Sequence, residues 1–373
     1  MCSMFRVMLA VLILALVLML ALMLVLTAGS VAHASALQPP EGRKIRVAVV
    51  MTEGAVVIDY AGPWEVFANV HTGTGDMDQQ MPFELYTVGR DGQPIHTSGG
   101  GMKPGMTVVP DYAFADAPAP DVVVVGAQSG DEQLGPWLRK LHEQHALIMS
   151  VCTGAFRVAE AGLLDGKPAT TYHASLQRLA NQYPHIDVRS SVRYVQSDPL
   201  IVTAGGLSSG IDSALHVVEL YYGAQVAQAT ADNMEYQGQG WKTNTGAGEP
   251  KQVLPTIPLA YRDHERIWQG TFLPEYPKPK PEMPVVLHLA LVDGQYRGTI
   301  DAPTESMIGE PLEDVRVDHG SIHFTLASDH GLVDFRGTMT ADRISGKVTH
   351  GGGSPTPLTL TLSKVRPSSQ ATR

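Results

Sequence analysis

Cys152 stands where a short apolar run meets a stretch of helical spacing, in the sequence Ser150-Val151-Cys152-Thr153-Gly154. The run that ends at Val151 is long enough for one buried strand, and after Gly154 apolar residues recur at intervals typical of a helix. Small residues around a nucleophile at such a bend indicate a nucleophile elbow, which lifts the reactive atom above a sheet. We therefore interpret Cys152 as a candidate nucleophile, with a buried structural cysteine as the alternative.

Two features favour a reactive thiol at this position. A helix that begins after Cys152 would direct free N–H groups and the positive end of its dipole toward the sulfur, and both favour the thiolate. The chain has two cysteines, and because Cys2 lies in the N-terminal apolar segment, Cys152 is the one thiol of the remaining chain. A single cysteine in an exported protein has no intramolecular disulfide partner, which indicates a reactive or intermolecular thiol.

The first 36 residues are predicted to be a targeting segment. An unbroken apolar run, Val7–Leu26, follows Arg6, and two Ala-x-Ala triplets within Ala32–Ala36 come at the distance of a signal-peptidase site. The run is also long enough to cross a bilayer if it is not cleaved. We expect residues 1–36 to be a signal peptide, with a membrane anchor as the alternative, and the folded part to be extracytoplasmic, either periplasmic or secreted.

Length and charge limit the classes of protein that this chain can belong to. Its 373 residues are enough for two domains, each with its own core. The formal net charge is −10 and no cluster of lysine and arginine is present, so we expect no nucleic-acid partner.

Residues 44–241 alternate apolar strands with helical segments, which predicts βαβ units and a doubly wound, mostly parallel α/β sheet. The expected strands are Ile45–Val50, Phe83–Val88, Asp121–Val125, Ala146–Val151 and Leu200–Ala204, with Val188–Val195 as an edge hairpin strand. The segment Gly99–Pro110 is expected to be irregular, with a short extended piece at Thr107–Val109. One helix is expected to begin at Pro63. Four more are expected over Glu132–Gln144, Leu176–Asn181, Ile211–Tyr222 and Val226–Met234. In such a sheet ligands bind outside the carboxyl ends of the strands.

Three predicted loops therefore meet at one edge of the sheet, and they suggest a division of roles. Cys152 is the expected nucleophile, and the N–H of Thr153, with that of Gly126 or Ala127, could form an oxyanion hole. Asp59, expected in the loop before the helix at Pro63, could hydrogen-bond the thiol or relay a proton. The alternative for Asp59 is a simple helix-capping carboxylate.

The C-terminal part changes character. Residues 242–263 are rich in Gly, Thr, Pro and Lys and are predicted to be a linker. From residue 264 to residue 365 apolar residues alternate with other side chains between short turns, which predicts a small antiparallel all-β domain, a barrel or a curved sandwich. The spacing of His319, His323, His330 and His350 fits no familiar ligand set, so we expect turn and surface residues and no metal.

Five motifs in the α/β part resemble the PfpI-like branch of the class I glutamine-amidotransferase-like superfamily. They are Asp59–Phe67, Ser150–Ala155, Ala161–Gly166, Ala169–Thr171 and Thr203–Asp212, within a match over Ile45–Trp241. The nearest subgroup comprises isonitrile hydratases and the ligand-sensing domains of AraC-type regulators. The resemblance implies a flavodoxin-like fold, a site formed by Asp59, Cys152 and Thr153, no cofactor and a homodimer.

The chain departs from this pattern at two places. The subgroup commonly has Thr-Thr-His-Trp where this chain has Thr170-Thr171-Tyr172-His173, and a shift of one residue in an extended segment reverses the side a residue faces. His173 is therefore either a catalytic base or a polar wall residue, and Tyr172 is a second possible site residue. Ala127 stands where a second glycine is more usual, which backbone N–H donation tolerates.

The β part resembles, more weakly, the β domain often fused ahead of secreted α/β-hydrolases. The resemblance rests on Trp268–Thr271, Gly298–Pro303, Phe335–Thr338 and Ile344–Gly346. It does not indicate a chemical role.

The resemblance and the elbow together predict an exported cysteine-dependent enzyme that hydrates or hydrolyses a small electrophile through a thio-adduct on Cys152. One alternative is a binding or sensing module without turnover, related to the AraC-type regulator domains. The other is a redox or stress-response protein in which Cys152 forms a sulfenic acid.

Overall fold

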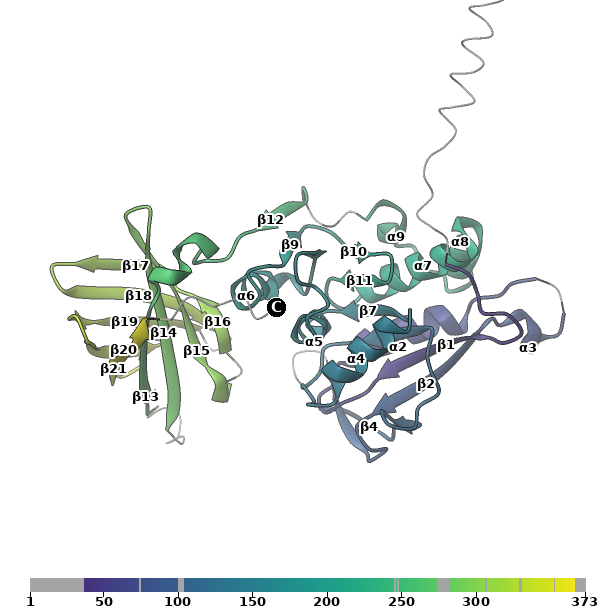
Figure 1. The fold of residues 1–373 in the computed structure, drawn as a ribbon, viewed down its shortest axis with the longest axis horizontal. Helices are drawn as coiled ribbons and strands as arrows, with labels where there is room; N and C mark the ends of the chain where they lie inside the picture. Colours follow the sequence, from purple (N-terminus) through teal and green to yellow (C-terminus); the bar gives the residue numbers. More distant parts are fainter. Residues whose placement is uncertain are drawn as a thin grey trace, which may run out of the picture.

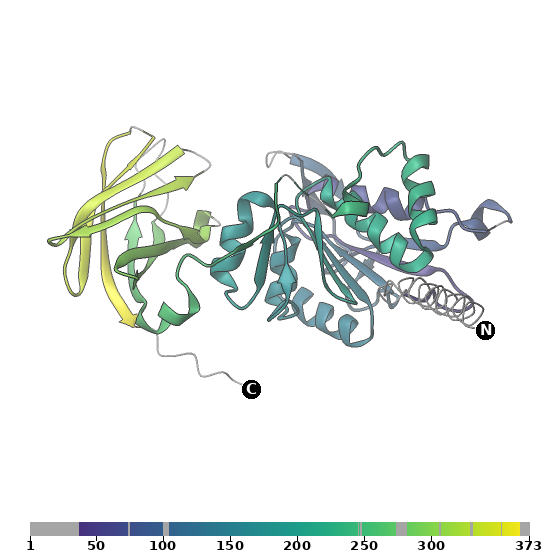
Figure 2. The same ribbon diagram turned by 90° about the horizontal axis from the view of Figure 1, so that it is seen from above.

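The computed structural model describes residues 37–365, apart from residues 74, 100–103, 245, 247, 274–281, 306, 329–330 and 352. Within these ranges the chain forms an α/β domain and a β domain that lie side by side, as Figures 1 and 2 show from two directions. The predicted targeting segment, residues 1–36, lies outside the described residues. None of the helices in the described ranges combines the length and the apolar composition needed to cross a membrane.

The α/β domain is built on a seven-stranded sheet in the order β10-β11-β7-β6-β1-β2-β5. Neighbours from β11 to β5 pair in parallel, and β10 pairs antiparallel with β11. The strands are β1 (Ile45–Val50), β2 (Phe83–Gly89), β5 (Tyr112–Ala113), β6 (Val122–Val125), β7 (Leu147–Val151), β10 (Tyr194–Asp198) and β11 (Ile201–Ala204). This confirms the predicted doubly wound, mostly parallel fold.

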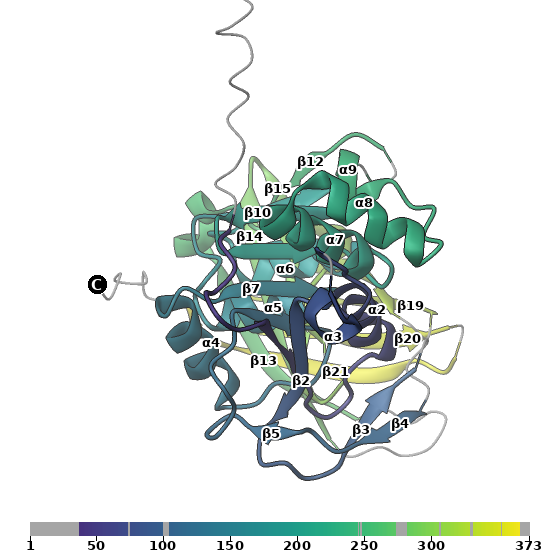
Figure 3. The ribbon, with the colours of Figure 1, turned by 90° about the vertical axis from the view of Figure 1, so that its right-hand side faces the viewer.

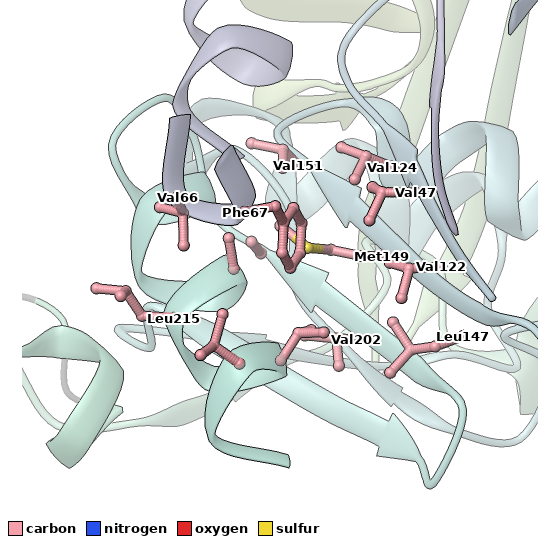
Figure 4. Close-up of a cluster of buried hydrophobic side chains, with 14 of the residues drawn as sticks. Val47, Val66, Phe67, Val122, Val124, Leu147, Met149, Val151, Val202 and Leu215 are labelled. Carbon is pink, nitrogen blue, oxygen red and sulfur yellow. The ribbon is translucent and has the colours of Figure 1, made fainter. Parts of the chain in front are cut away.

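Helices cover both faces of this sheet because each central strand is apolar on both sides. One face packs against α2, α7 and α8, and the other against α4, α5 and α6 (Figure 3). Figure 4 shows the first core, in which Phe67 lies among side chains of the central strands, such as Val122 and Met149. The helices are α2 (Val57–Ala68), α3 (Met77–Gln80), α4 (Leu134–Glu143), α5 (Gly154–Glu160), α6 (Leu176–Gln182), α7 (Ser209–Tyr222), α8 (Ala224–Asn233) and α9 (Gly240–Thr243).

Two of the predicted segments differ in the structure. The single hairpin strand expected over 188–195 is two strands, β9 (Asp187–Ser190) and β10, because Ser191 has a φ of 58° and breaks the extended run. The halves join different sheets: β9 lies between β8 (Pro168–Ala169) and β12 (Lys251–Val253), and the latter falls within the predicted linker.

The second difference is in the segment predicted to be irregular. In place of a short extended piece at Thr107–Val109 it contains a longer strand that begins earlier, β4 (Pro104–Val108), which pairs with β3 (Ile95–Ser98). The side chains of β4 are exposed or half-buried, so the strand carries no apolar alternation from which it could be read.

The β domain is one antiparallel sheet in the order β16-β15-β14-β13-β21-β20-β19-β18-β17. Its two edge strands are consecutive in the chain and separated by Leu312 alone, so the sheet curls until its edges meet, as a nearly closed barrel. Trp268 and the stacked pair Phe324–Phe335, with ring centroids 4.7 Å apart, fill the interior. The strands are β13 (Arg266–Phe272), β14 (Met283–Val292), β15 (Gln295–Ala302), β16 (Met307–Pro311), β17 (Glu313–Asp318), β18 (Ser321–Ser328), β19 (Gly331–Met339), β20 (Arg343–His350) and β21 (Thr356–Val365).

Candidate functional site

Cys152 occupies a sharp turn between β7 and α5, as the sequence predicts. Its φ is 58°, a left-handed conformation that is uncommon for a residue with a side chain and that is found at strained functional turns. The turn brings Gly154 so close to β6 that a Cβ atom there would lie 2.0 Å from the carbonyl oxygen of Val125. Glycine is thus required two residues after the cysteine, which explains the spacing of the motif.

Asp59 lies in the first turn of α2, not in a loop before a helix that begins at Pro63, so that prediction is wrong. Proline removes only the hydrogen bond to the Asp59 carbonyl. Tyr60 before the proline and Phe67 after it pack against the same core, which keeps the helix continuous through Pro63. As a result the Asp59 side chain is carried on a rigid helix and not on a mobile loop.

The Asp59 carboxyl is fully buried and faces the thiol of Cys152. Its Oδ2 accepts a hydrogen bond from the N–H of Ala127 at 3.0 Å, while Oδ1 is buried and has no conventional partner. Gly126 allows this approach, because a Cβ atom there would lie 2.9 Å from that of Asp59. The structure therefore brings together the three segments that the sequence assigns to one edge of the sheet.

Burial controls the ionisation of this pair. It raises the pKa of Asp59 to about 6, against the lowering effect of the Ala127 N–H. Burial, together with the negative charge of Asp59, raises the pKa of the Cys152 thiol to about 12. The expectation of a resting thiolate is thus wrong: the N–H groups near the sulfur lower its pKa, but desolvation of a thiol that is 7% exposed outweighs them.

Two backbone N–H groups face the sulfur, those of Thr153 and Leu207. The role of the Thr153 N–H in an oxyanion hole stays a prediction, and the N–H of Ala127 donates to Asp59. Leu207 is not among the site residues that the sequence predicts. It follows β11 in a Gly-Gly loop at the same edge of the sheet, and that position was the available signal. Its φ of 53° is left-handed, like that of Cys152, so a second turn of uncommon backbone conformation lies beside the elbow.

The segment with the displaced histidine also lies beside the elbow. Thr171 donates a hydrogen bond from its hydroxyl to the carbonyl of Cys152 at 2.7 Å, and the Tyr172 ring packs on Gly206. His173 is exposed and its ring meets that of Tyr172 edge-on, with centroids 4.3 Å apart. The hydrogen bonds around Cys152 and Asp59 do not include His173, and its part in catalysis stays a prediction.

Thr171→Val is expected to destabilise the protein by about 1 kcal/mol, because the buried carbonyl of Cys152 loses its best donor while the shape of the side chain is kept. Urea unfolding measures the change. Thr107→Val, on the exposed strand β4, is the matched control and should shift stability by less than about 0.5 kcal/mol. Equal effects of the two substitutions would contradict the assigned role of the Thr171 hydroxyl.

Among the described residues no group of three or more His, Cys, Asp or Glu side chains could hold a metal ion. Of the histidines considered in the sequence, His323 pairs with Asp334 at 3.0 Å and His319 with Asp318 at 3.5 Å. His350 lies 3.4 Å from the Ser328 hydroxyl, and His330 is outside the described residues.

Comparisons with known proteins agree with this architecture. Residues 45–220 match the model of the DJ-1/PfpI family. Over 188 residues the chain is 31% identical to an isonitrile hydratase of Pseudomonas putida, which covers 48% of this chain and 73% of that protein. The chain therefore belongs to the DJ-1/PfpI family.

A transcriptional regulator, CdhR of Pseudomonas aeruginosa, is 30% identical over 150 residues, which is 39% of this chain and 43% of the regulator. A crystal structure of a ThiJ/PfpI family protein from Pseudomonas syringae aligns with a TM-score of 0.43 and 23% identity, over 52% of this chain and 76% of that one. The relatives of this chain thus include an enzyme, the isonitrile hydratase, and a regulator, CdhR.

Proposed function

We propose that the protein is an exported enzyme that hydrates a small electrophile, of the isonitrile type, through a covalent adduct on Cys152. The observation that carries the proposal is the buried pair of Cys152 and Asp59, in which one carboxyl oxygen is held by Ala127 and the other has no conventional partner. The relationship to an isonitrile hydratase supports the choice of substrate class.

The protonation states of the pair suit this chemistry. Near neutral pH the thiol keeps its proton and Asp59 is close to its pKa of about 6, so the carboxyl can both accept and donate a proton. As sulfur bonds to the terminal carbon of an isonitrile, its proton passes through Asp59 to that carbon, which gives a thioimidate. Water then adds to the carbon and one of its protons passes to nitrogen. The carbon–sulfur bond breaks, the remaining proton of that water passes to sulfur, and the N-substituted formamide leaves with the original thiol proton as its formyl hydrogen.

Backbone N–H groups would assist the step in which charge develops. The N–H groups of Thr153 and Leu207 face the sulfur and stabilise negative charge on it as its proton leaves. Both belong to turns of fixed geometry, so little reorganisation is needed at the moment of reaction.

Formation of an N-substituted formamide from an alkyl isonitrile, followed by chromatography, tests the proposal. The full chain should turn the substrate over, and Cys152→Ser should reduce turnover by at least about 10³-fold because serine is a far weaker nucleophile at neutral pH. Ser150→Ala, which changes a hydroxyl on the strand just before the elbow, is the control and should retain most of the activity. Equal turnover by the Cys152→Ser variant would refute the covalent route.

Ligand binding without turnover is the second candidate, since a regulator is also related and the thiol is neutral and mostly buried. It would be favoured if Cys152→Ser bound a small ligand with unchanged affinity and no tested electrophile were converted. A redox role receives less support, because the raised pKa of Cys152 keeps the thiolate that reacts with peroxide scarce.

The extracytoplasmic location is part of the proposal and rests on the apolar N-terminal segment. Cell fractionation with sequencing of the mature N-terminus tests it: a new terminus near residue 36 is expected, and full-length protein in the cytoplasm would contradict it. The homodimer implied by the family resemblance is likewise a prediction, which light scattering after gel filtration can check.

A further inference from the structure

The β domain docks on the α/β domain through its edge strand. Strand β16 lies against α6, as Figure 1 shows. The side chains of two residues on α6 donate hydrogen bonds to carbonyl oxygens of β16: Asn181 to Gly309 at 2.7 Å, and Gln182 to Ile308 at 2.6 Å. The helix therefore satisfies backbone groups that an edge strand would otherwise leave without partners.

Asn181 is the centre of this contact. It is 4% exposed, and in addition to Gly309 its side chain accepts a hydrogen bond from the N–H of Thr256 at 2.6 Å. Its backbone carbonyl accepts a further bond from Arg262 at 2.7 Å. A buried amide with all of these partners has one favourable orientation. It therefore holds α6, β16 and the segment between the two domains that carries Thr256 and Arg262 in one arrangement.

Gly309 is held from both sides. Its N–H donates to Asp301 at 2.7 Å, and Asp301 in turn binds the partly buried ring of His288 at 3.1 Å. Its φ is +69°, and a Cβ atom at this position would lie 3.3 Å from Cβ of Asn181 and 3.3 Å from Cγ of Gln182. The contact therefore depends on the absence of a side chain at position 309.

The helix that receives β16 is connected to the elbow by two routes. It begins directly after the segment in which Thr171 donates to the carbonyl of Cys152. In addition, Arg178 of α6 stacks on the ring of Phe156, one turn after the elbow, with 4.5 Å between guanidinium carbon and ring centroid. The same guanidinium lies 3.8 Å from Glu310 of β16.

We propose that the β domain is a positioning element of the Cys152 site, in which β16 fixes α6 and, through Thr171 and Arg178, the backbone of the elbow. None of the β-domain residues in this contact touches the sulfur, so they act through α6. The inference uses the proposed function only in taking Cys152 as the reactive group. It gives the β domain a task that neither the elbow nor the family relationship assigns.

The test compares Gly309→Ala with Gly320→Ala in the full chain. Both glycines have positive φ, +69° and +80°, but Gly320 lies in a hairpin turn of the β domain where nothing comes nearer to an added Cβ than 3.7 Å. The two substitutions thus impose similar backbone strain, and only one of them presses on α6. The readouts are the rate at which iodoacetamide alkylates Cys152 and the rate of hydrogen exchange in residues 170–182. Both are measured under conditions in which the variants remain folded.

Gly309→Ala is expected to increase exchange in residues 170–182 and to raise the alkylation rate of Cys152 at least five-fold, because a loosened elbow exposes a thiol that is now mostly buried. Gly320→Ala should change neither. If both variants alkylate at the wild-type rate and exchange changes only inside the β domain, the proposal is overturned.

Gln182→Ala provides the second variant if Gly309→Ala does not accumulate. It removes one hydrogen bond to β16 without adding volume and should raise the alkylation rate about two-fold in the same direction. An unchanged rate would count against the proposal. Because alkylation needs no turnover, these outcomes are independent of whether isonitriles are substrates.

Discussion

Asp59→Asn is expected to change the two activities of Cys152 in opposite directions. Turnover should fall by about 10²–10⁴-fold, since an amide cannot carry the proton from sulfur to the substrate carbon. Alkylation by iodoacetamide should become about ten-fold faster, because the negative charge that raises the pKa of the thiol is removed and each unit of pKa is a factor of ten in thiolate. A variant with a more reactive thiol and a less active enzyme separates acid–base catalysis from simple nucleophilicity.

Asp131→Asn is the matched control for this experiment. Asp131 is a carboxylate in the loop that follows β6, where it lies 3.5 Å from Arg90 and does not belong to the Cys152 pair. Its replacement should leave both rates within about two-fold. Slower alkylation of the Asp59→Asn variant would contradict the electrostatic coupling on which the mechanism rests.

Asp59→Asn is also expected to stabilise the protein, by an amount that depends on pH. Burial raises the pKa of Asp59 from 3.8 to about 6, so the folded state holds the proton more tightly than the unfolded chain does. The stability that this provides is complete below about pH 4 and is lost as the pH rises through 6. A pKa shift of about two units lowers the free energy of unfolding of the wild type by about 3 kcal/mol at pH 7.5. Asparagine does not ionise, so the variant would not lose this free energy.

Urea unfolding of wild type and Asp59→Asn at pH 4 and at pH 7.5 measures this difference. The variant should be more stable than wild type by about 2–3 kcal/mol at pH 7.5, and the gain should vanish near pH 4. Asp131→Asn, examined in parallel, should show no such trend. A gain of the same size at both pH values would exclude the ionisation of Asp59 as its cause.

These two results would describe one compromise. The buried carboxyl of Asp59 lowers the stability of the fold near neutral pH, and the same carboxyl transfers the proton in the proposed reaction. Proteins commonly give up stability at positions that function requires.

Local patterns predicted the elbow because they are short-range. The apolar run before Cys152 and the small residues after it are decided within a few positions of the chain, and the structure has β7 end at Val151 and α5 begin at Gly154. The alternation of the C-terminal part predicted an antiparallel β domain for the same reason. Its closure follows from the order of strands, in which β16 and β17 are neighbours in the chain.

What the sequence missed depends on long-range packing. The sequence pattern predicts that α2 starts at Pro63, but the helix begins at Val57, because Tyr60 as well as Phe67 packs against the core. The thiol was expected to be ionised from the end of the helix beside it, whereas its burial and the buried carboxyl of Asp59 come from other parts of the chain. The N–H of Leu207 faces the sulfur only because β11 lies beside β7.

The docking of β16 on α6 could not be derived from the sequence at all. Asn181 and Gly309 are 128 positions apart, and neither stands in a motif. Their contact becomes visible only when the two domains are seen together.

The most direct measurement of the central claim is the mass of the protein during turnover. We expect rapid acid quenching of the full chain with an alkyl isonitrile to show a species heavier by the mass of one isonitrile, located on the peptide that contains Cys152. The species should disappear when the substrate is consumed and should be absent from Cys152→Ser. Formamide produced without any adduct on Cys152, or at an equal rate by Cys152→Ser, would contradict the account.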